Sequence, residues 1–203
     1  MPAGYPVPAD SVRVEDVILG SRFIATVGVA ATAEEARAFI EAVRAEFRDA
    51  THSCWAYVAG PPGSTASIGL SDAGEPHGTA GRPMLDVLLH SGVGEVVAVV
   101  TRYFGGTKLG TGGLVRAYGG AVQHALAQLR TVQRVARIAV AIEAGYADVA
   151  RLRRLLEQVG AEVQEESFAE VVRYRAAVPE AALAAFEADV ADLSAGRARI
   201  TRL

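Results

Sequence analysis

One stretch of this sequence combines glycines with cationic side chains at a spacing that could bind an anion. Residues 101–120 read TRYFGGTKLGTGGLVRAYGG and hold seven of the chain's 21 glycines. Glycine at this density is typical of a backbone that adopts positive φ or approaches another group closely. Gly105 and Gly110 have the P-loop separation, but Thr111 stands where the P-loop lysine belongs. Val115 replaces the third glycine of a dinucleotide-binding fingerprint, so both named motifs are excluded.

The stretch still predicts an anion site, because it leads directly into a helix. The first N–H groups of a helix lack intrahelical partners, and the helix macrodipole adds positive potential there. Cations precede the helix, lie in its first turn and follow the preceding strand. The residues predicted to bind a phosphate-like anion are Arg102, Lys108, Gly110, Thr111, Gly112, Gly113 and Arg116. The alternative is that the glycines serve a tight turn and close helix–sheet packing.

A second glycine-rich loop, SDAGEPHGTAGRP at residues 71–83, also precedes a helix. By the same argument it predicts a second anion site, formed by Gly78, Thr79, Gly81 and Arg82. Asp72 and Glu75 in this loop have two interpretations. They could be an acid–base pair or ligands of a hard cation. The alternative is that they are turn formers, with Asp72 accepting hydrogen bonds from backbone amides.

His52 and Cys54 lie two residues apart, on one face of a predicted strand. A Cys–His pair could be a nucleophile and its base. The alternative is that the cysteine is a small buried hydrophobe. Because Cys54 is the only cysteine, an internal disulfide and a Cys-rich zinc site are excluded. His77 and His124 lack a metal-ligand spacing, and we predict no metal or other cofactor.

Charge and composition restrict the class of partner. The 203 residues carry a formal net charge of −3, whereas domains that bind polyanions over a wide surface carry a basic excess. Contact with nucleic acid would therefore come from a local patch. The N-terminal sequence has no basic region followed by an apolar run, and the apolar stretch at residues 96–100 is too short to cross a bilayer. We expect a cytoplasmic protein without membrane contact.

Regular elements must position the two glycine-rich loops. Runs of β-branched residues predict strands, and apolar residues at helical spacing predict helices. Thr32 suits an N-cap, and Glu35 completes a capping box with it. The predicted strands cover residues 21–29, 54–58 and 96–101, and the predicted helices begin at Thr32, Met84 and Leu114.

After residue 134 the elements follow a different order. The pattern predicts strands at residues 136–143, 161–166, 168–178 and 197–203, with helices at residues 148–158 and 179–193. The order β-α-β-β-α-β is the signature of a ferredoxin-like domain. We place the boundary within residues 131–135. The fold class predicted is α+β, with an α/β domain over residues 1–132 and a ferredoxin-like domain over residues 133–203.

Two runs of this sequence resemble a known family. EPHGTAGRPMLDVLLHSG and VVTRYFGGTKLGTGGLVRAYGGAV are similar to the signature of the IMPACT/YigZ family, and weaker agreement extends through SRFIA and THSCWAY. The resemblance implies an N-terminal fold like ribosomal small-subunit protein second domains and elongation factor G domain four, with a ferredoxin-like C-terminal domain. It also implies a role linked to translation or to nucleic acid, and no settled enzymatic activity. Ala73 and His77 depart from the family's usual residues, which weakens a metal site in that loop.

These observations lead to three hypotheses about function. The first is a non-enzymatic binding or regulatory protein linked to translation, whose glycine-rich helix starts engage RNA or another phosphate-bearing ligand. A ribosome-associated component is then an expected partner. The second is a hydrolase-like enzyme acting on a small phosphorylated or acyl substrate through Asp72, Glu75, His77 or Cys54. The third is a protein-interaction regulator that docks through its C-terminal sheet and makes no contact with nucleic acid.

Overall fold

A five-stranded antiparallel sheet is the centre of the first half of the chain. The computed structural model describes residues 4–203, so residues 1–3 of the predicted first domain lie outside this range. The described chain divides into two units, which meet in the sequence at Arg134 and Val135. Neighbouring strands in the sheet of the first unit are all antiparallel. In spatial order these strands are β2 (Val12–Ile18), β3 (Ser21–Val29), β6 (Val96–Tyr103), β4 (His52–Val58) and β5 (Ile68–Ser71).

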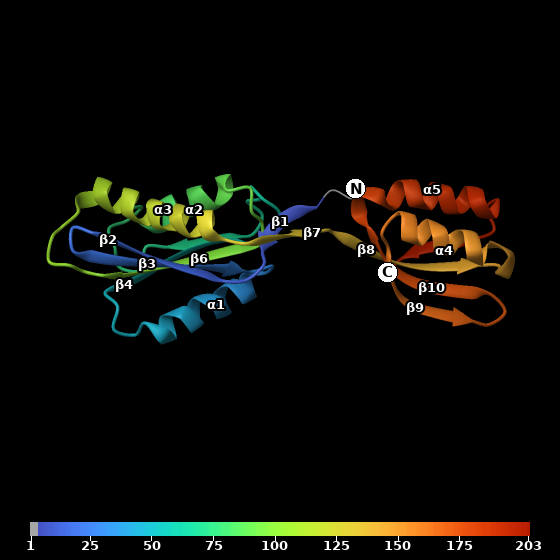
Figure 1. Ribbon diagram of the computed structural model, residues 1–203, viewed down its shortest axis with the longest axis horizontal. Helices are drawn as coiled ribbons and strands as arrows, with labels where there is room; N and C mark the ends of the chain where they lie inside the picture. Colours follow the sequence, from blue (N-terminus) through green and yellow to red (C-terminus); the bar gives the residue numbers. More distant parts are fainter. Residues whose placement is uncertain (1–3) are drawn as a thin grey trace. The chain divides into compact units, whose positions relative to one another are not determined.

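Helices cover both faces of this sheet (Figure 1). Helices α2 (Gly81–His90) and α3 (Gly110–Gln128) lie on one face, and α1 (Ala33–Glu46) lies on the other. The central strand β6 is therefore buried on both sides. Its residues 96, 98 and 100 pack with α2 and α3, whereas residues 97 and 99 pack with α1. Burial on both faces explains why β6 is a continuous apolar run without polar alternation.

The helix starts differ in how well local sequence predicts them. Thr32 caps α1 as predicted, because its Oγ1 accepts a hydrogen bond from the Glu35 N–H at 3.1 Å. The Glu35 carboxylate accepts from the Ala31 N–H at 2.8 Å, one residue before the position that a capping box uses. Helix α3 begins at Gly110, a turn earlier than the apolar periodicity from Leu114 indicates. Gly110 has a φ of +70°, which glycine adopts without strain.

A short ribbon pairs the two sequence ends of the first unit. Strand β1 (Tyr5–Pro8) runs antiparallel to β7 (Thr131–Arg134). Sequence reasoning finds only a domain boundary there, because four-residue strands are too short for a periodic pattern. The buried carboxylate of Glu95 holds both strands: its Oε1 accepts from the Tyr5 hydroxyl at 2.7 Å and lies 2.8 Å from Arg134 Nε.

The second unit is a four-stranded antiparallel sheet with two helices. The strand order is β11-β8-β10-β9, and the main elements follow one another as the β-α-β-β-α-β series predicted from the sequence. Ile142 and Tyr174 from the sheet share a core with Leu152 and Phe186 from the helices. Its elements are β8 (Arg137–Ala144), α4 (Val149–Gln158), β9 (Glu162–Phe168), β10 (Val172–Pro179), α5 (Leu183–Ser194) and β11 (Arg199–Arg202).

No helix within residues 4–203 combines the length and the apolar character needed to cross a bilayer.

Candidate binding site

The two glycine-rich segments meet at one pocket in the first unit. The pocket has a volume of about 340 Å³ and lies where β6 ends and α3 begins. Its wall combines the loop before α2, the end of β6, the loop that follows it and the first turn of α3. The lining residues are Glu75, Pro76, Arg102, Phe104, Lys108, Leu109, Gly110, Thr111 and Leu114. The pocket therefore joins cations predicted from the sequence to a carboxylate from the other loop.

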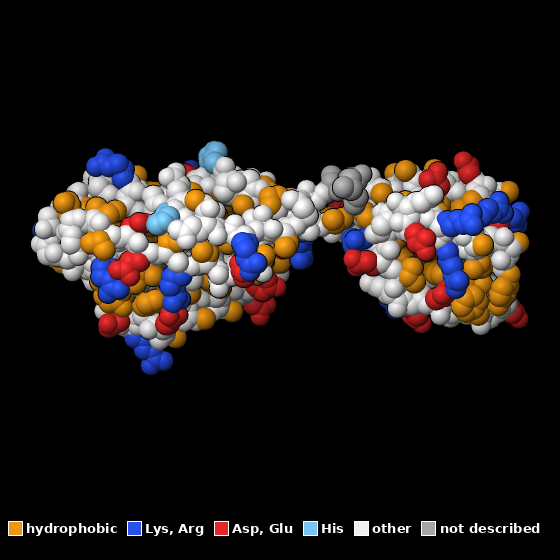
Figure 2. Space-filling view, in the orientation of Figure 1, with side chains coloured by type: hydrophobic (Ala, Val, Ile, Leu, Met, Phe, Trp, Pro, Cys, Tyr) orange, Lys and Arg blue, Asp and Glu red, His pale blue; other side chains and the backbone are white. Residues whose placement is uncertain are grey.

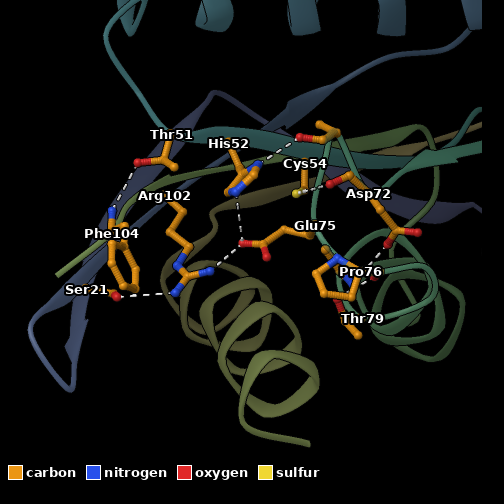
Figure 3. Close-up of polar contacts among 12 residues, drawn as sticks. Ser21, Thr51, His52, Cys54, Asp72, Glu75, Pro76, Thr79, Arg102 and Phe104 are labelled. Carbon is orange, nitrogen blue, oxygen red and sulfur yellow. Dashed lines mark hydrogen bonds and ion pairs between the residues drawn. The ribbon is translucent and has the colours of Figure 1, made fainter. Parts of the chain in front are cut away.

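A buried ion pair lies at the base of this pocket (Figure 3). Arg102 Nη1 donates to Glu75 Oε1 at 2.6 Å, and the two side chains are only 6% and 4% exposed. The Tyr118 hydroxyl donates to the same oxygen at 2.7 Å. Burial raises the pKa of Tyr118, which keeps the phenol protonated as a donor. A buried charge pair is tolerated only when hydrogen bonds accompany it, and Tyr118 supplies one here.

Arg102 is held by more than its carboxylate partner. Its guanidinium carbon lies 5.3 Å from the centre of the Phe23 ring and 5.6 Å from that of Phe104. Nη2 reaches Ser21 Oγ at 3.4 Å, a long contact. Nε is buried and has no hydrogen-bond partner among the described residues. Arg102 was predicted as a cation of the anion site, but its guanidinium forms a buried ion pair with Glu75.

The carboxylate of Glu75 is only partly used by the protein. Both strong hydrogen bonds fall on Oε1, and His52 Nε2 lies 4.0 Å from the same oxygen. No donor from residues 4–203 bonds to Oε2. Figure 3 shows one Glu75 oxygen inside the network of contacts and the other outside it. Oε2 is not among the buried side-chain atoms that lack a hydrogen-bond partner.

The N–H groups at the start of α2 already donate to a carboxylate of the protein, that of Asp72. Asp72 accepts from the N–H groups of Gly78 at 2.8 Å, Ala80 at 3.0 Å and Gly81 at 2.9 Å. Burial opposes ionisation of this carboxyl, but the three donors outweigh it and lower the pKa of Asp72. The interpretation of Asp72 as an acceptor of backbone amides is confirmed. The N–H groups of Gly78 and Gly81, predicted for an external anion, are directed to Asp72.

The other residues predicted near α2 also have local roles. Thr79 Oγ1 donates to the Pro76 carbonyl at 2.6 Å, and Arg82 pairs with Asp86 at 2.9 Å. His77 is fully exposed, with Nδ1 3.7 Å from Asp72 Oδ2. None of these three lines the pocket that holds Lys108. The two predicted anion sites are therefore not equivalent.

The start of α3 has no such internal partner. No side chain of the described residues caps this helix, and its first turn contains no acidic residue. Lys108 and residues 110–112 are exposed. Arg116 does not line the pocket but reaches back along the helix: a Cβ on Gly112 would lie 3.7 Å from Arg116 Nη1. Within residues 4–203, neither cation forms an ion pair.

Cys54 and His52 each contact a backbone carbonyl of the loop before α2 and do not bond to one another. Cys54 is fully buried on β4, and its thiol donates to the Asp72 carbonyl at 2.9 Å. Burial raises the pKa of Cys54 to about 12, which disfavours the reactive thiolate. His52 Nδ1 lies 3.0 Å from the Ala73 carbonyl, so this histidine contacts the loop before α2 and not the thiol. These contacts favour the interpretation of Cys54 as a buried hydrophobe.

Two groups, one behind the pocket and one lining it, were not predicted from the sequence. Tyr118 belongs to the apolar stripe of α3, and that pattern does not show that its hydroxyl meets a carboxylate. Phe104 follows β6 and is 47% exposed beside the pocket. A large aromatic residue between a strand and a glycine pair is the signal that could have indicated Phe104. The described residues contain no group of three or more His, Cys, Asp or Glu side chains placed to hold a metal ion.

Comparisons with known proteins match both units. The Impact N-terminal domain matches residues 19–126, and a domain of unknown function, DUF1949, matches residues 142–197. IMPACT family member YigZ of Escherichia coli K12 is 45% identical over 190 residues, covering 94% of this chain and 93% of its own. An IMPACT family member of Haemophilus influenzae is 40% identical over 195 residues, covering 96% and 95%. A solved structure described as a crystal structure of a hypothetical protein has 42% identity and a TM-score of 0.73, covering 100% of this chain and 98% of its own.

Proposed function

Because this chain belongs to the IMPACT family, we propose that it is a non-enzymatic binding protein linked to translation, which engages phosphates of RNA at the start of α3. The observation that carries this proposal is the uncapped N-terminus of α3, flanked by Lys108 and Arg116. Its free N–H groups and its macrodipole attract an anion, and the two cations add charge-assisted hydrogen bonds.

The contrast between α2 and α3 supports the choice of site. Both helices follow glycine-rich loops, but Asp72 supplies the anion at α2 from within the chain. At α3 the equivalent position is open to solvent. An external phosphate at α3 would take the place that the Asp72 carboxylate takes at α2.

The distribution of charge favours a local contact over a broad one. On the face drawn in Figure 2, cationic and anionic side chains are interspersed, and the formal net charge of the chain is −3. A few phosphates bound at one helix start fit this surface better than a duplex lying along it. The link to translation rests on the family resemblance. We further propose that the first unit resembles ribosomal small-subunit protein second domains and elongation factor G domain four, and that the second is ferredoxin-like.

The test removes both cations while leaving the helix intact. The double variant Lys108→Ala/Arg116→Ala should bind a short single-stranded RNA more weakly by roughly 2–4 kcal/mol, about 30- to 1,000-fold, if each charged hydrogen bond contributes about 1.5–3 kcal/mol without full additivity. The dependence of affinity on salt should also become shallower, because fewer counterions are released. Fluorescence anisotropy at several salt concentrations measures both quantities.

A matched control removes two exposed arginines from the opposite face of the same sheet. Arg37 and Arg48 lie on and just after α1, and Arg37→Ala/Arg48→Ala makes the same change in net charge. It should leave RNA affinity within about twofold of the parent protein, as expected for distant surface charges. Equal losses in the two double variants would mean that only net charge matters, and no change in either would remove the proposed site.

A further inference from the structure

The sheet of the second unit has an open edge at β9. This strand is the last in the order β11-β8-β10-β9, and within residues 4–203 it pairs with β10 alone. All seven of its residues are exposed, and Figure 1 shows β9 along the border of the unit. Alternate residues of such an edge strand point their N–H and C=O groups away from the sheet, where a further strand can bond to them.

A groove lies beside this edge, between β9 and α4. Its volume is about 340 Å³, and its apolar lining includes Leu156, Ala161, Val163 and Tyr174. Val163 lies opposite Ala176, a core residue beneath the helices, so its side chain is on the helix face of the sheet. There it is 48% exposed. Because side chains alternate along a strand, every second side chain of a strand added to β9 would point toward this groove.

Exposed apolar side chains occur further along the same face of β9. Phe168 lies opposite the core residue Val172 and is 55% exposed, with its ring centre 6.4 Å from that of Tyr146. Val171, in the turn that follows, is also exposed. In Figure 2, hydrophobic side chains gather on the second unit where Figure 1 draws this turn. An exposed apolar patch is typical of a surface that binds another protein.

The charges around β9 indicate which kind of strand fits. Glu165 on β9 and Glu157, which lines the groove, form no ion pair within residues 4–203, although Glu165 lies opposite Arg175 in the ladder. The other two glutamates of β9 each pair with an arginine. Two copies of β9 side by side would bring glutamates together, and like charges on neighbouring strands are destabilising. A cationic strand would instead meet opposite charge.

We propose that β9 binds an extended, cationic segment of a partner protein, which becomes a fifth strand of this sheet. The main chain of the segment pairs with the open edge of β9. Its apolar side chains enter the groove beside α4, and the lysines or arginines between them lie near Glu165 on the opposite face. This surface belongs to the second unit, so the inference does not depend on the RNA contact proposed at α3.

The test uses the full-length protein and a fluorescein-labelled heptapeptide in which lysine and valine alternate and both ends are blocked. Fluorescence anisotropy should show saturable binding with a dissociation constant below about 1 mM, equivalent to about 4 kcal/mol. The same peptide with glutamate in place of lysine should bind at least about tenfold more weakly.

Two modified peptides test the main-chain pairing. One carries N-methyl groups on its valines and the other on its lysines. In a paired strand, alternate N–H groups face the neighbouring strand and the others point away from it. One modified peptide should therefore bind at least about tenfold more weakly than the parent peptide, and the other should stay within about threefold of it.

Two protein variants locate the contact. Val163→Lys places a cation in the groove and should weaken the lysine–valine peptide about tenfold. Glu165→Lys replaces an attraction by a repulsion and should weaken it about threefold to tenfold. The control Asp189→Lys makes the same change in charge at an exposed position of α5 and should leave the affinity within about twofold.

Three results would overturn the proposal. The first is that the lysine–valine peptide does not bind, or that both N-methylated peptides bind as well as it does. The second is an equal loss of affinity in Glu165→Lys and Asp189→Lys, because net charge alone would then explain the binding. The third is a dimer in light scattering that Val163→Lys dissociates, which would assign β9 to a second copy of this chain. If a variant does not fold, the comparison of peptides on the unchanged protein decides.

Discussion

Replacing Asp72 by asparagine tests whether the carboxylate charge stabilises the start of α2. Asparagine has nearly the same size, but it is neutral and has one acceptor oxygen in place of two. Asp72 Oδ1 accepts from Ala80 and Gly81, and Oδ2 accepts from Gly78. In Asp72→Asn one of these oxygens becomes an NH₂ group, which cannot accept. At least one bond to a charged acceptor is therefore lost.

The expected loss follows from these contacts. A hydrogen bond to a charged group contributes about 1.5–3 kcal/mol, and the charge at the helix start adds about 0.3–1 kcal/mol. Asparagine recovers part of this, because its remaining amide oxygen still accepts a hydrogen bond. The free energy of unfolding at pH 7 should therefore fall by roughly 2–3 kcal/mol. The control is Asp86→Asn on the same helix, where Asp86 forms a surface ion pair with Arg82. This variant should lose less than about 0.5 kcal/mol of unfolding free energy.

The assay uses the position of the only tryptophan. Trp55 lies on β4, so its fluorescence during urea denaturation reports unfolding of the first unit. The pKa of Asp72 is lower in the folded protein than in the unfolded chain, so the unfolded chain binds more protons in the acid range. The stabilisation from Asp72 should then be complete above about pH 5 and should be lost as pH falls below about 4. The difference between parent and variant should shrink over that interval.

A difference in unfolding free energy that stays constant from pH 7 to pH 3 would refute this reasoning. The side chain would then stabilise the fold through its size and shape alone, and its negative charge would add no stability at the start of α2. That result would also weaken the argument for an external anion at α3, which depends on the same physics.

Four further changes test packing in the first unit. Tyr118→Phe removes one donor from a buried carboxylate and should cost about 1–3 kcal/mol of unfolding free energy in the tryptophan assay. Cys54→Ala should cost about 1 kcal/mol, and the parent thiol should resist alkylation in the folded state, as quenched labelling followed by mass spectrometry can show. Gly105→Ala would place a Cβ 1.9 Å from the Gly20 carbonyl carbon and should prevent stable folding, whereas Gly120→Ala meets open space inside α3 and should raise stability by about 0.5–1 kcal/mol in thermal denaturation.

Local sequence predicted the elements whose signals are local. Strand β3 covers the predicted residues 21–29, and Thr32 caps α1, because alternation and capping depend on neighbouring residues. The start of α3 was placed a turn late, since glycines carry no apolar periodicity. Strands β1 and β7 were missed because each becomes a strand only by pairing with the other.

The site was predictable in its residue types but not in its partners. Lys108 and residues 110–111 were predicted together and do line one pocket. The ion pair of Arg102 with Glu75 joins residues separated by 27 positions, and the bond from Tyr118 spans 43. No periodic pattern identifies such contacts. They follow from the sheet register that brings the end of β6 beside the loop before α2.

The ribbon of β1 and β7 has a consequence for dissecting the protein into fragments. The Impact N-terminal domain match covers residues 19–126, and a fragment cut to those limits would lack both strands of the ribbon. It would also lack Tyr5 and Arg134, leaving the buried Glu95 carboxylate without either contact. A buried charge stripped of its partners is strongly destabilising. A fragment limited to the matched residues would therefore tend to be insoluble. A fragment that begins before Tyr5 and ends after Arg134 would keep the β1–β7 pairing and both contacts to Glu95.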